Sequence, residues 1–363
     1  MPRIAYFITP HGFGHAARAS AIMDAVSDIL PFVSFDIFTT VPKWFFEDSL
    51  SGWFEYHEFL TDVGLVQKTP FLHHLKETIE TLKRFIPFAP ALISDTAYFL
   101  TKRECRLVIC DISPIGIVIA AEAGVPSILV ENFTWDWIYE VFIPADPRFR
   151  GYMDFFRDIY RGVDYHIQAS PVCNPKSVDM TTGPISRKVR LSSVQVREKL
   201  GISQEKKMVL VTTGGVKEKY QFLKYLTSKP EICFVIPGAS EFPEKHDNLI
   251  LLPYRSGFIH SDLVNAADAV VGKAGYSTIA EVYQAGVPLG YVPRTNFRET
   301  AKLVAFIEKE MTGMRIDDDE FKVGKWLPKV SRLLNFPCIP RHDRNGSFQA
   351  AGMINDILKQ EQN

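Results

Sequence analysis

The stretch AADAVVGKAGYSTIAEVYQAGVPLGYVPRTNFRET, residues 266–300, decides the fold of this chain. It predicts a strand up to Val271, a glycine-containing loop, a helix from Ser277 that Gly286 ends, and a further strand after Pro288. A strand, a helix and a second strand in this order form the crossover unit of a parallel sheet whose faces are covered by helices.

The same alternation runs through the rest of the chain. We predict strands at Ile4–Ile8, Val33–Thr39, Leu107–Cys110, Ser127–Glu131, Asp164–Ala169, Lys207–Thr212, Ile232–Ile236, Leu249–Leu252, Ala269–Val271 and Leu289–Val292, of which the fifth and the last close their halves. We predict helices at His15–Leu30, Pro114–Ala123, Glu218–Leu226, Ser261–Ala267, Ser277–Ala285 and Gly346–Leu358. The pattern indicates an α/β protein with two doubly wound, Rossmann-like domains.

The break between the two halves falls near residue 182, where TTGPISRKV has no apolar period and contains Gly183 and Pro184. We expect an N-terminal domain over 1–182 and a C-terminal domain over 183–345. The helix within 346–363 is expected to pack back on the first domain. A cleft between two such domains is the usual place for a ligand.

Composition excludes several classes of protein. The 363 residues carry 41 Lys+Arg against 42 Asp+Glu, a formal net charge of -1, and no basic block, so we expect no nucleic-acid partner. The N-terminus lacks the long apolar stretch of a signal peptide, and no run approaches the roughly 18 apolar residues of a membrane span. We therefore expect a cytoplasmic protein, with peripheral membrane contact left open. The 5 cysteines are scattered without a CxxC pair, which argues against a metal or disulfide role.

The loop before the predicted helix at Ser277 suits a phosphate. A helix N-terminus presents unpaired N–H groups and the positive end of a dipole. Gly275 allows close approach, Ser277 and Thr278 add hydroxyl donors, and Glu281 one turn later could accept hydrogen bonds from a ribose diol. Thr278-Ile-Ala-Glu281 is also a capping box, in which the two side chains only satisfy backbone donors.

A second glycine-rich turn, HGFGHAAR from His11 to Arg18, follows the first predicted strand. Gly12, Gly14 and Ala17 match the spacing of a dinucleotide fingerprint. NAD binding would also require an acid at the end of the second strand, which here ends in two threonines. The fingerprint alone is therefore a weak signal.

Several motifs together resemble the GT-B glycosyltransferases. They are HGFGHAAR, CDISP at 110–114, ENFTWDWIYE at 131–140, GPISRK at 183–188, the stretch 266–300 and NGSFQAAGMI near the end. The resemblance covers most of both halves. It is greatest to the branch with the peptidoglycan N-acetylglucosaminyltransferase that makes lipid II, and to the glycosyltransferase-like N-terminal half of plant arabinokinases.

The resemblance implies a donor site in the C-terminal domain. In the family, a glutamate matching Glu281 holds the ribose, and the loop matching Ala274–Thr278 meets the pyrophosphate. The segment matching Pro253–Arg255 passes the base. Further positions implied to lie near the donor are Gly12, Gly14, Gly214, Gly215, Tyr254, Arg255, Lys273, Gly275, Ser277, Arg298 and Glu299.

The resemblance also gives the first turn a role. Some inverting GT-B enzymes place a histidine after the first strand and an aspartate after a later one, and His15 and Asp111 match these positions. A neutral histidine could take the proton of an attacking hydroxyl, while a carboxylate fixes its tautomer. Alternatively His15 packs in the fold or contacts a phosphate, and His11 is a weaker candidate for the base. Arg18 is expected to be a solvated or interdomain charge.

The expected function is transfer of a sugar from a nucleotide-diphosphate sugar to a hydroxyl of a glycan, lipid or small molecule, and a UDP-sugar is the expected donor. No tightly bound cofactor or metal is expected, since helix N-termini with Arg298 or Lys273 could stabilise the diphosphate. The aromatic run NFTWDWIYEVF either lines the acceptor site or belongs to the core. One alternative is a nucleotide-sugar 2-epimerase using Asp111, Glu131 and Glu299, and another is a non-catalytic nucleotide-sugar sensor. The sequence leaves open the sugar, the base, the acceptor, the stereochemistry and the oligomeric state.

Overall fold

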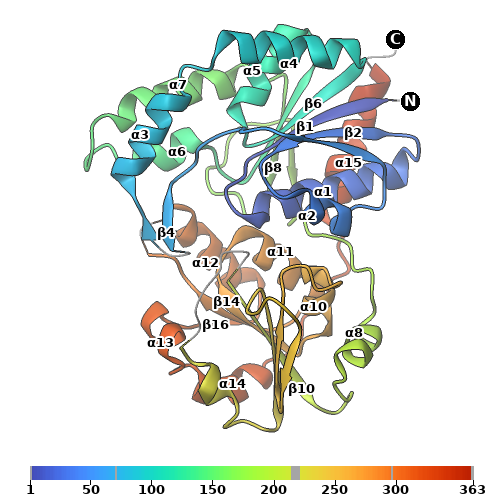
Figure 1. Ribbon diagram of the computed structural model, residues 1–363, viewed down its shortest axis with the longest axis vertical. Coiled ribbons are helices and arrows are strands. Elements are labelled where there is room, and N and C mark those ends of the chain that lie inside the picture. The colour runs from blue at the N-terminus through green and yellow to red at the C-terminus, as the bar shows by residue number, and fades with distance from the viewer. Residues whose placement is uncertain (1, 70–71, 214–220, 296, 361–363) are drawn as a thin grey trace. The chain divides into compact units, whose positions relative to one another are not determined.

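The computed structural model describes residues 2–69, 72–213, 221–295 and 297–360 (Figure 1). Its contacts divide the chain into two compact units. Unit 1 consists of Met1–Lys68, His73–Ile185 and Arg344–Asn363, and unit 2 of Thr69–Leu72 and Ser186–Asp343. Each unit is built on a seven-stranded sheet with helices. The predicted α/β, Rossmann-like fold class is confirmed.

The sheet of unit 1 is parallel throughout, with the strand order β3-β2-β1-β6-β7-β8-β9. Its strands are β1 (Arg3–Ile8), β2 (Ser34–Thr39), β3 (Phe54–Glu58), β6 (Cys105–Asp111), β7 (Ser127–Glu131), β8 (Tyr165–Ala169) and β9 (Met180–Thr182). The short strands β4 (Gln67–Thr69) and β5 (Leu72–His73) pair separately.

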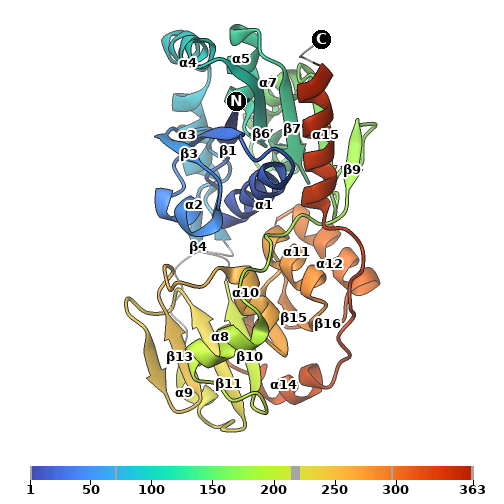
Figure 2. The ribbon, with the colours of Figure 1, turned by 90° about the vertical axis from the view of Figure 1, so that its right-hand side faces the viewer.

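Helices cover both faces of this sheet (Figures 1 and 2). They are α1 (Phe13–Ile29), α2 (Lys43–Ser49), α3 (Leu75–Phe85), α4 (Pro90–Lys102), α5 (Pro114–Ala123), α6 (Trp135–Glu140), α7 (Phe149–Arg161) and α15 (Gly346–Gln360). The last helix, α15, packs against α1 and β9. Gly346 N donates to the carbonyl of Pro184, which ties the start of α15 to the end of this unit's main segment.

The sheet of unit 2 has the order β12-β13-β11-β10-β14-β15-β16, and within it β12 is antiparallel to β13. Its strands are β10 (Lys207–Thr212), β11 (Ile232–Pro237), β12 (Glu244–His246), β13 (Leu249–Leu252), β14 (Ala269–Lys273), β15 (Leu289–Val292) and β16 (Gly313–Arg315). Its helices are α8 (Ser193–Leu200), α9 (Leu223–Leu226), α10 (His260–Ala266), α11 (Tyr276–Ala285), α12 (Glu299–Glu310), α13 (Asp318–Val323) and α14 (Leu327–Leu334).

Two sequence-based expectations about the sheet edges are wrong. Asp164–Ala169 is not the last strand of the first half, because β9 pairs with β8 beyond it. Likewise β16 pairs with β15 after Leu289–Val292. Both additional strands have three residues and no run of buried apolar side chains, so their sequences give no strand signal. The predicted helix Glu218–Leu226 begins outside the described residues, and its described part holds α9.

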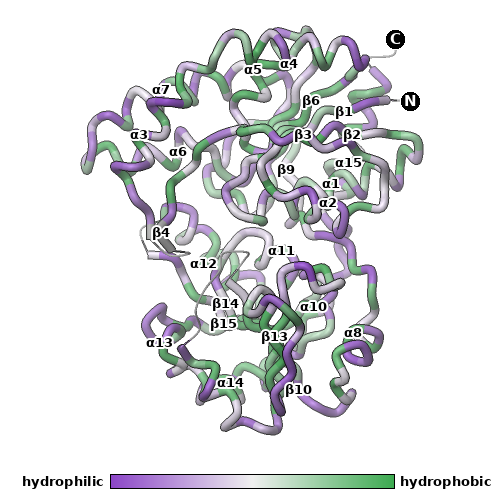
Figure 3. The backbone as a smooth tube through the Cα atoms, viewed as in Figure 1, coloured by the Kyte–Doolittle hydropathy of each residue, from purple (hydrophilic) through white to green (hydrophobic). Residues whose placement is uncertain are grey.

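The cores lie between the sheets and their helices. Strands buried on both faces read as continuous apolar runs, as in β10 and β14, and Figure 3 shows such hydrophobic colour along β13. Cys110 and Cys233 are buried strand residues, as expected, and all five cysteines are free thiols. Among the described residues, no helix combines the length and the apolar character that crossing a membrane requires.

Gly286 gives a first testable prediction. It ends α11 with a φ of 70°, and an added Cβ would lie 2.1 Å from the carbonyl oxygen of Ile339. Gly201 ends α8 with a φ of 63°, but there the added Cβ would meet only Lys245 Nζ, the far end of a long side chain that can move away. We expect Gly201→Ala to cost about 1 kcal/mol of unfolding free energy and Gly286→Ala at least about 2 kcal/mol more. Urea unfolding followed by circular dichroism measures both, and equal losses would contradict the steric argument.

Candidate functional site

The polar centre of unit 1 forms where strands β1, β6 and β7 end. Asp111 is the last residue of β6, His15 and Arg18 lie in the first turns of α1, and Asn132 follows β7. His15 Nδ1 lies 2.8 Å from Asp111 Oδ1. Arg18 donates from Nε to Asp111 Oδ2 at 2.7 Å and from an Nη to Oδ1 at 2.6 Å. Its other Nη donates to Asn132 Oδ1 at 2.7 Å.

The turn before α1 explains how these side chains reach Asp111. Gly12 precedes the helix with a φ of 81°, which glycine adopts readily, and Gly14 is the second helical residue. His15 and Arg18 are three residues apart and therefore share one face of α1. The predicted pairing of His15 with Asp111 is thus present in the geometry, while its catalytic role stays a prediction.

The expectation that Arg18 is a solvated or interdomain charge is wrong. Arg18 is only 1% exposed and forms a bidentate ion pair with Asp111. A buried guanidinium needs a carboxylate and further acceptors, and Asp111 with Asn132 supply them. The spacing His15-x-x-Arg18 was the available signal, because it places both side chains over the same strand end.

The neighbouring charge and hydrogen bonds keep Asp111 ionised, and this determines which ring nitrogen of His15 carries a proton. Burial pushes the pKa of Asp111 upward, but the charge of Arg18 and the hydrogen bonds from His15 and Arg18 outweigh it, so the pKa lies below its usual value. An ionised carboxylate only accepts hydrogen bonds, so we assign the ring proton of His15 to Nδ1. In neutral His15, Nε2 is then the atom that can accept a proton.

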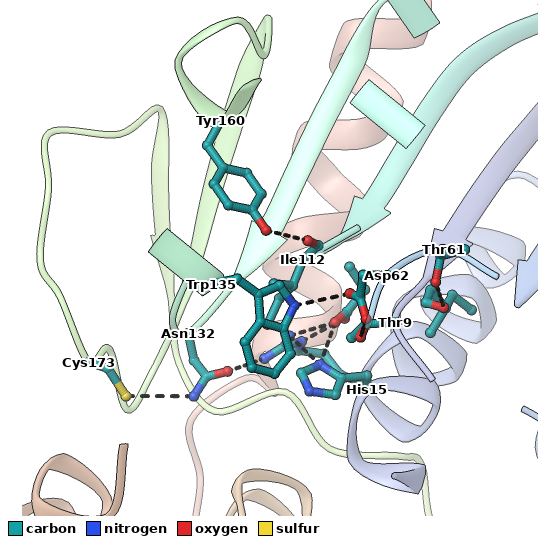
Figure 4. A network of polar contacts seen from close by, with 12 residues as sticks. Thr9, His15, Thr61, Asp62, Ile112, Asn132, Trp135, Tyr160 and Cys173 are labelled. Carbon is teal, nitrogen blue, oxygen red and sulfur yellow. Dashed lines mark hydrogen bonds and ion pairs between the residues drawn. The ribbon is translucent and has the colours of Figure 1, made fainter. Parts of the chain in front are cut away.

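A second buried carboxylate, Asp62, lies in the same network (Figure 4). It accepts hydrogen bonds from Thr9 Oγ1 at 2.7 Å and from Trp135 Nε1 at 3.0 Å. Burial raises its pKa to about 7, against which those two hydrogen bonds act, and the charge of Asp111 raises it further. No sequence motif pointed to Asp62, since its partners lie 53 and 73 residues away.

In unit 2, Glu281 is the most strongly constrained side chain of the predicted donor site. It is 3% exposed, and its two oxygens meet Arg187 Nε at 2.9 Å and His260 Nδ1 at 2.5 Å. Burial pushes its pKa upward, but Arg187 and His260 outweigh this effect and lower the pKa to about 2. His260 Nε2 in turn lies 3.2 Å from Thr212 Oγ1, at the end of β10.

The capping-box alternative for Glu281 is therefore wrong. Helix α11 begins at Tyr276 after Gly275, so Thr278 lies inside its first turn and not at the cap. No side chain caps this N-terminus. The Glu281 carboxylate binds two side chains from other elements, Arg187 and His260, neither of which was predicted as a site residue.

The backbone before α11 is tightly packed against β10. A Cβ added at Gly272 would lie 1.9 Å from the carbonyl oxygen of Thr212, so only glycine fits this position. Ala274 N donates to the carbonyl of Val292, which holds the loop against β15. Ser277 and Thr278 follow in the first turn of α11. This brings the predicted loop residues together at the carboxyl ends of β14 and β15.

A cluster of charges lies beside this loop. Lys273 ends β14, Arg294 follows β15, and Glu299 begins α12. Arg294 donates to Glu299 Oε2 at 2.8 Å, and its guanidinium carbon lies 3.7 Å from the centroid of the Phe297 ring. Lys273 and Glu299 were predicted site residues, whereas Arg294 was not. Arg298 is the N-cap residue of α12.

The remaining predicted donor residues are dispersed. Tyr254 follows β13 and is half-buried with its ring against Gly238, where an added Cβ would lie 2.3 Å from the ring. Arg255 is exposed. Gly214 and Gly215 lie outside the described residues.

The carboxylates proposed for an epimerase do not gather in unit 1. Asp111 pairs in register with Val130, so Asp111 and Glu131 point to opposite faces of the sheet. Glu131 binds His166 at 2.9 Å and Gln168 at 2.8 Å. Its other oxygen has no partner and is buried. Glu299 belongs to unit 2 and is bound to Arg294.

One group of side chains in the described chain has metal-ligand spacing, with ligand atoms of Asp36, Glu55 and His57 within 4.8 Å of one another. Guanidinium groups already occupy its carboxylates. Arg3 binds Asp36 at 2.9 Å, and Arg103 binds Glu55. Two cations beside the ligands oppose a bound metal ion, so the donor set does not fit one.

The aromatic run near residue 135 belongs mainly to the core. Trp135 and Tyr139 are fully buried, stack on each other, and are fixed by hydrogen bonds from the indole to Asp62 and from the phenol to the Gly64 carbonyl. The ring of His11 lies 5.2 Å from that of Trp135.

Two sequence comparisons show which known proteins this chain is similar to. The model of the glycosyltransferase family 28 C-terminal domain matches residues 237–355, which include His260, Glu281 and Arg294. L-arabinokinase of Arabidopsis thaliana is 28% identical over 355 residues, which are 95% of this chain. They make up 33% of that protein, so the chain spans about a third of the length of its relative.

Solved glycosyltransferase structures share the fold. UGT89C1 of Arabidopsis thaliana in complex with UDP has a TM-score of 0.61 at 12% identity and covers 100% of both chains. Phytolacca americana UGT2, solved with UDP-2-fluoro-glucose and pterostilbene, has a TM-score of 0.61 at 13% identity, covering 100% of this chain and 95% of its own. The chain therefore has the GT-B fold. Residues 237–355 are in addition similar to the glycosyltransferase family 28 C-terminal domain.

Asp62 gives a prediction about pH. Its folded-state pKa of about 7 exceeds the ordinary value of 3.8 for an aspartate, so between these pH values the folded state holds more protons than the unfolded state. The contribution of Asp62 to the unfolding free energy is therefore fully present below about pH 4 and is lost as pH rises through 7. Asp62→Asn removes this titration while keeping groups for both hydrogen bonds.

We expect the unfolding free energy of Asp62→Asn, relative to that of the wild type, to rise by on the order of 3 kcal/mol between pH 4 and pH 8. Urea unfolding followed by tryptophan fluorescence measures this, because unit 1 contains Trp44, Trp53, Trp135 and Trp137. The exposed Asp95→Asn serves as control and should show no such trend. A constant difference between Asp62→Asn and wild type would contradict the assignment.

Proposed function

We propose that the protein is a glycosyltransferase that transfers a sugar from a UDP-sugar to a hydroxyl acceptor. The observation that carries this proposal is Glu281, a buried, ionised carboxylate fixed by Arg187 and His260 one turn into the helix that follows Gly275. The family 28 match over 237–355 and the glycosyltransferase neighbours support it.

Glu281 is suited to hold a ribose diol. A carboxylate has about four acceptor positions, of which Arg187 and His260 take one each in the recorded contacts, so two hydroxyl donors can still bind. The contacts with Arg187 and His260 restrict the rotation of the carboxylate, which lowers the entropy lost on binding. The diphosphate would then lie at the N-terminus of α11, where Ser277 and Thr278 add hydroxyl donors to the backbone N–H groups.

The acceptor half of the reaction is assigned to unit 1. His15 Nε2 would take the proton of the acceptor hydroxyl as its oxygen forms a bond to the anomeric carbon and the bond from that carbon to the diphosphate breaks. Asp111 holds the ring by Nδ1 and so presents Nε2 to the acceptor. Stabilisation of the departing diphosphate by helix dipoles and cations would make a metal ion unnecessary.

The donor assignment predicts a selective thermal shift. A ligand that binds only the folded state at a hundredfold excess over its Kd adds about 2.7 kcal/mol to the unfolding free energy. We expect UDP and UDP-sugars to raise the melting temperature of the wild type and of Gln284→Ala, whose residue lies on the same helix. Glu281→Gln should abolish this shift. Shifts with ADP or ATP alone would instead favour a kinase-like nucleotide site, and no shift with any nucleotide would contradict the proposal.

The base assignment predicts a loss of turnover without a loss of donor binding. We expect His15→Gln to lower acceptor-dependent UDP release by about 10²–10⁴-fold, the usual contribution of a general base. Its thermal shift with UDP should stay unchanged, because Glu281 lies in unit 2. His11→Gln is the matched control from the same turn. Full activity in His15→Gln with loss in His11→Gln would move the base to His11, and binding without turnover in the wild type would identify a sensor.

A further inference from the structure

Lys273 lies where an anionic ligand of the proposed donor site would approach the backbone. It is the last residue of β14, two residues before the N-cap of α11. A Cβ added at Gly275 would lie 3.7 Å from Lys273 Cε, so the lysine stem runs beside the loop that leads into this helix. Within the described chain, no hydrogen-bond or ion-pair acceptor is recorded for its ammonium group.

Arg294 is a second cation in the same cluster and is rigidly held. It is 8% exposed, its Nη donates to Glu299 Oε2 at 2.8 Å, and its guanidinium stacks on Phe297 at 3.7 Å. Arg294 is thus paired with Glu299, and the charges of both groups act on Lys273. The cluster has a formal charge of +1 when Lys273 is protonated and is neutral when it is not.

The described groups that act on Lys273 come from two elements. Burial lowers its pKa to about 7, the charge of Arg294 after β15 lowers it further, and Glu299 at the start of α12 opposes both. A buried ammonium beside another cation is stabilised when an anion binds close to it. Near neutral pH, the binding of an anion and the charge of Lys273 are therefore coupled.

We propose that Lys273 and Arg294 form a two-cation site for the diphosphate of the donor, and that Lys273 takes up a proton from the solvent when this anion binds. This inference rests on the proposed function. No substrate bond changes in the step: the buffer acid loses one proton, and the ε-amine of Lys273 gains it. At pH 8, full positive charge is thereby present only in the complex with the anion.

Proton uptake can be measured by isothermal titration calorimetry of the wild type with UDP in two buffers of different ionisation enthalpy. The amine should be about nine-tenths deprotonated at pH 8 and about one-tenth at pH 6. We expect an uptake of nearly one proton per UDP at pH 8 and almost none at pH 6. Uridine, which has the ribose but no phosphate, should bind without this uptake. This control distinguishes proton uptake by Lys273 from proton uptake by the pair of Glu281 and His260.

Variants separate the two cations. Lys273→Arg keeps a permanent charge, so it should bind UDP without proton uptake at pH 8. Lys273→Met should weaken UDP binding about tenfold or more and also show no uptake. Arg294→Gln should weaken UDP binding and reduce the uptake at pH 8 without abolishing it, because the charge that lowers the pKa of Lys273 is removed. Lys302→Arg, at an exposed position of α12, should behave as the wild type.

UDP binding without uptake in the wild type, or with undiminished uptake in Lys273→Arg, would overturn the inference and leave the proposed function intact. Because the wild-type titration needs no variant, this test stands even if a substitution at Lys273 prevents folding. Failure of the wild type to bind UDP, ADP or GDP would overturn the proposed donor site itself, and this inference with it.

Discussion

The chemistry of both units depends on one constraint of parallel sheets. Parallel strands end at the same edge of a sheet. At this edge the last carbonyl groups of the strands lie outside the hydrogen-bonded ladder, and the following helices begin. Asp111 ends β6 and Lys273 ends β14, while Arg294 follows β15. Two glycines allow the backbone geometry at these edges. Gly272 lets β14 approach Thr212 closely, and Gly12 adopts the positive φ of the turn that leads into α1. Each unit therefore gathers its polar side chains without any long loop.

Each unit also fixes its central carboxylate with a buried arginine. Arg18 binds Asp111 through two hydrogen bonds, and Arg187 binds Glu281. Removing such charges from water is costly, and a buried pair is often no more stable than apolar residues of the same volume. What the pairs supply is preorganisation, because an ionised carboxylate held in one orientation needs little rearrangement when its ligand arrives. In unit 1 Arg18 also offsets the charge of Asp111, so Asp111 acts on His15 mainly through orientation.

The sequence permits prediction of what depends on local pattern and strand order. Alternating apolar runs and helical stretches give the doubly wound sheets, and the positions of His15 and Asp111 after their strands predict the contact that is found. Arg18 and Arg294 escape prediction as site residues because their roles arise from partners on other elements. The Thr278–Glu281 motif misleads for the same reason. Its spacing fits a cap, but the helix starts earlier at Tyr276 and the carboxylate finds cations elsewhere in the fold.

The charge balance distinguishes the two units. In unit 1, Arg18 and Asp111 form a buried ion pair, and His15 contacts the same carboxylate. In unit 2, Arg187 and Glu281 form an ion pair, and the charges of both Arg294 and Glu299 act on Lys273. Positive charge thus accumulates beside the N-terminus of α11, whose dipole has the same sign. The cations and the positive end of the helix dipole repel each other in the unliganded protein, and both attract an anion. A diphosphate satisfies this arrangement better than a neutral ligand, and unit 1 has no comparable excess of positive charge among the described residues around Asp111.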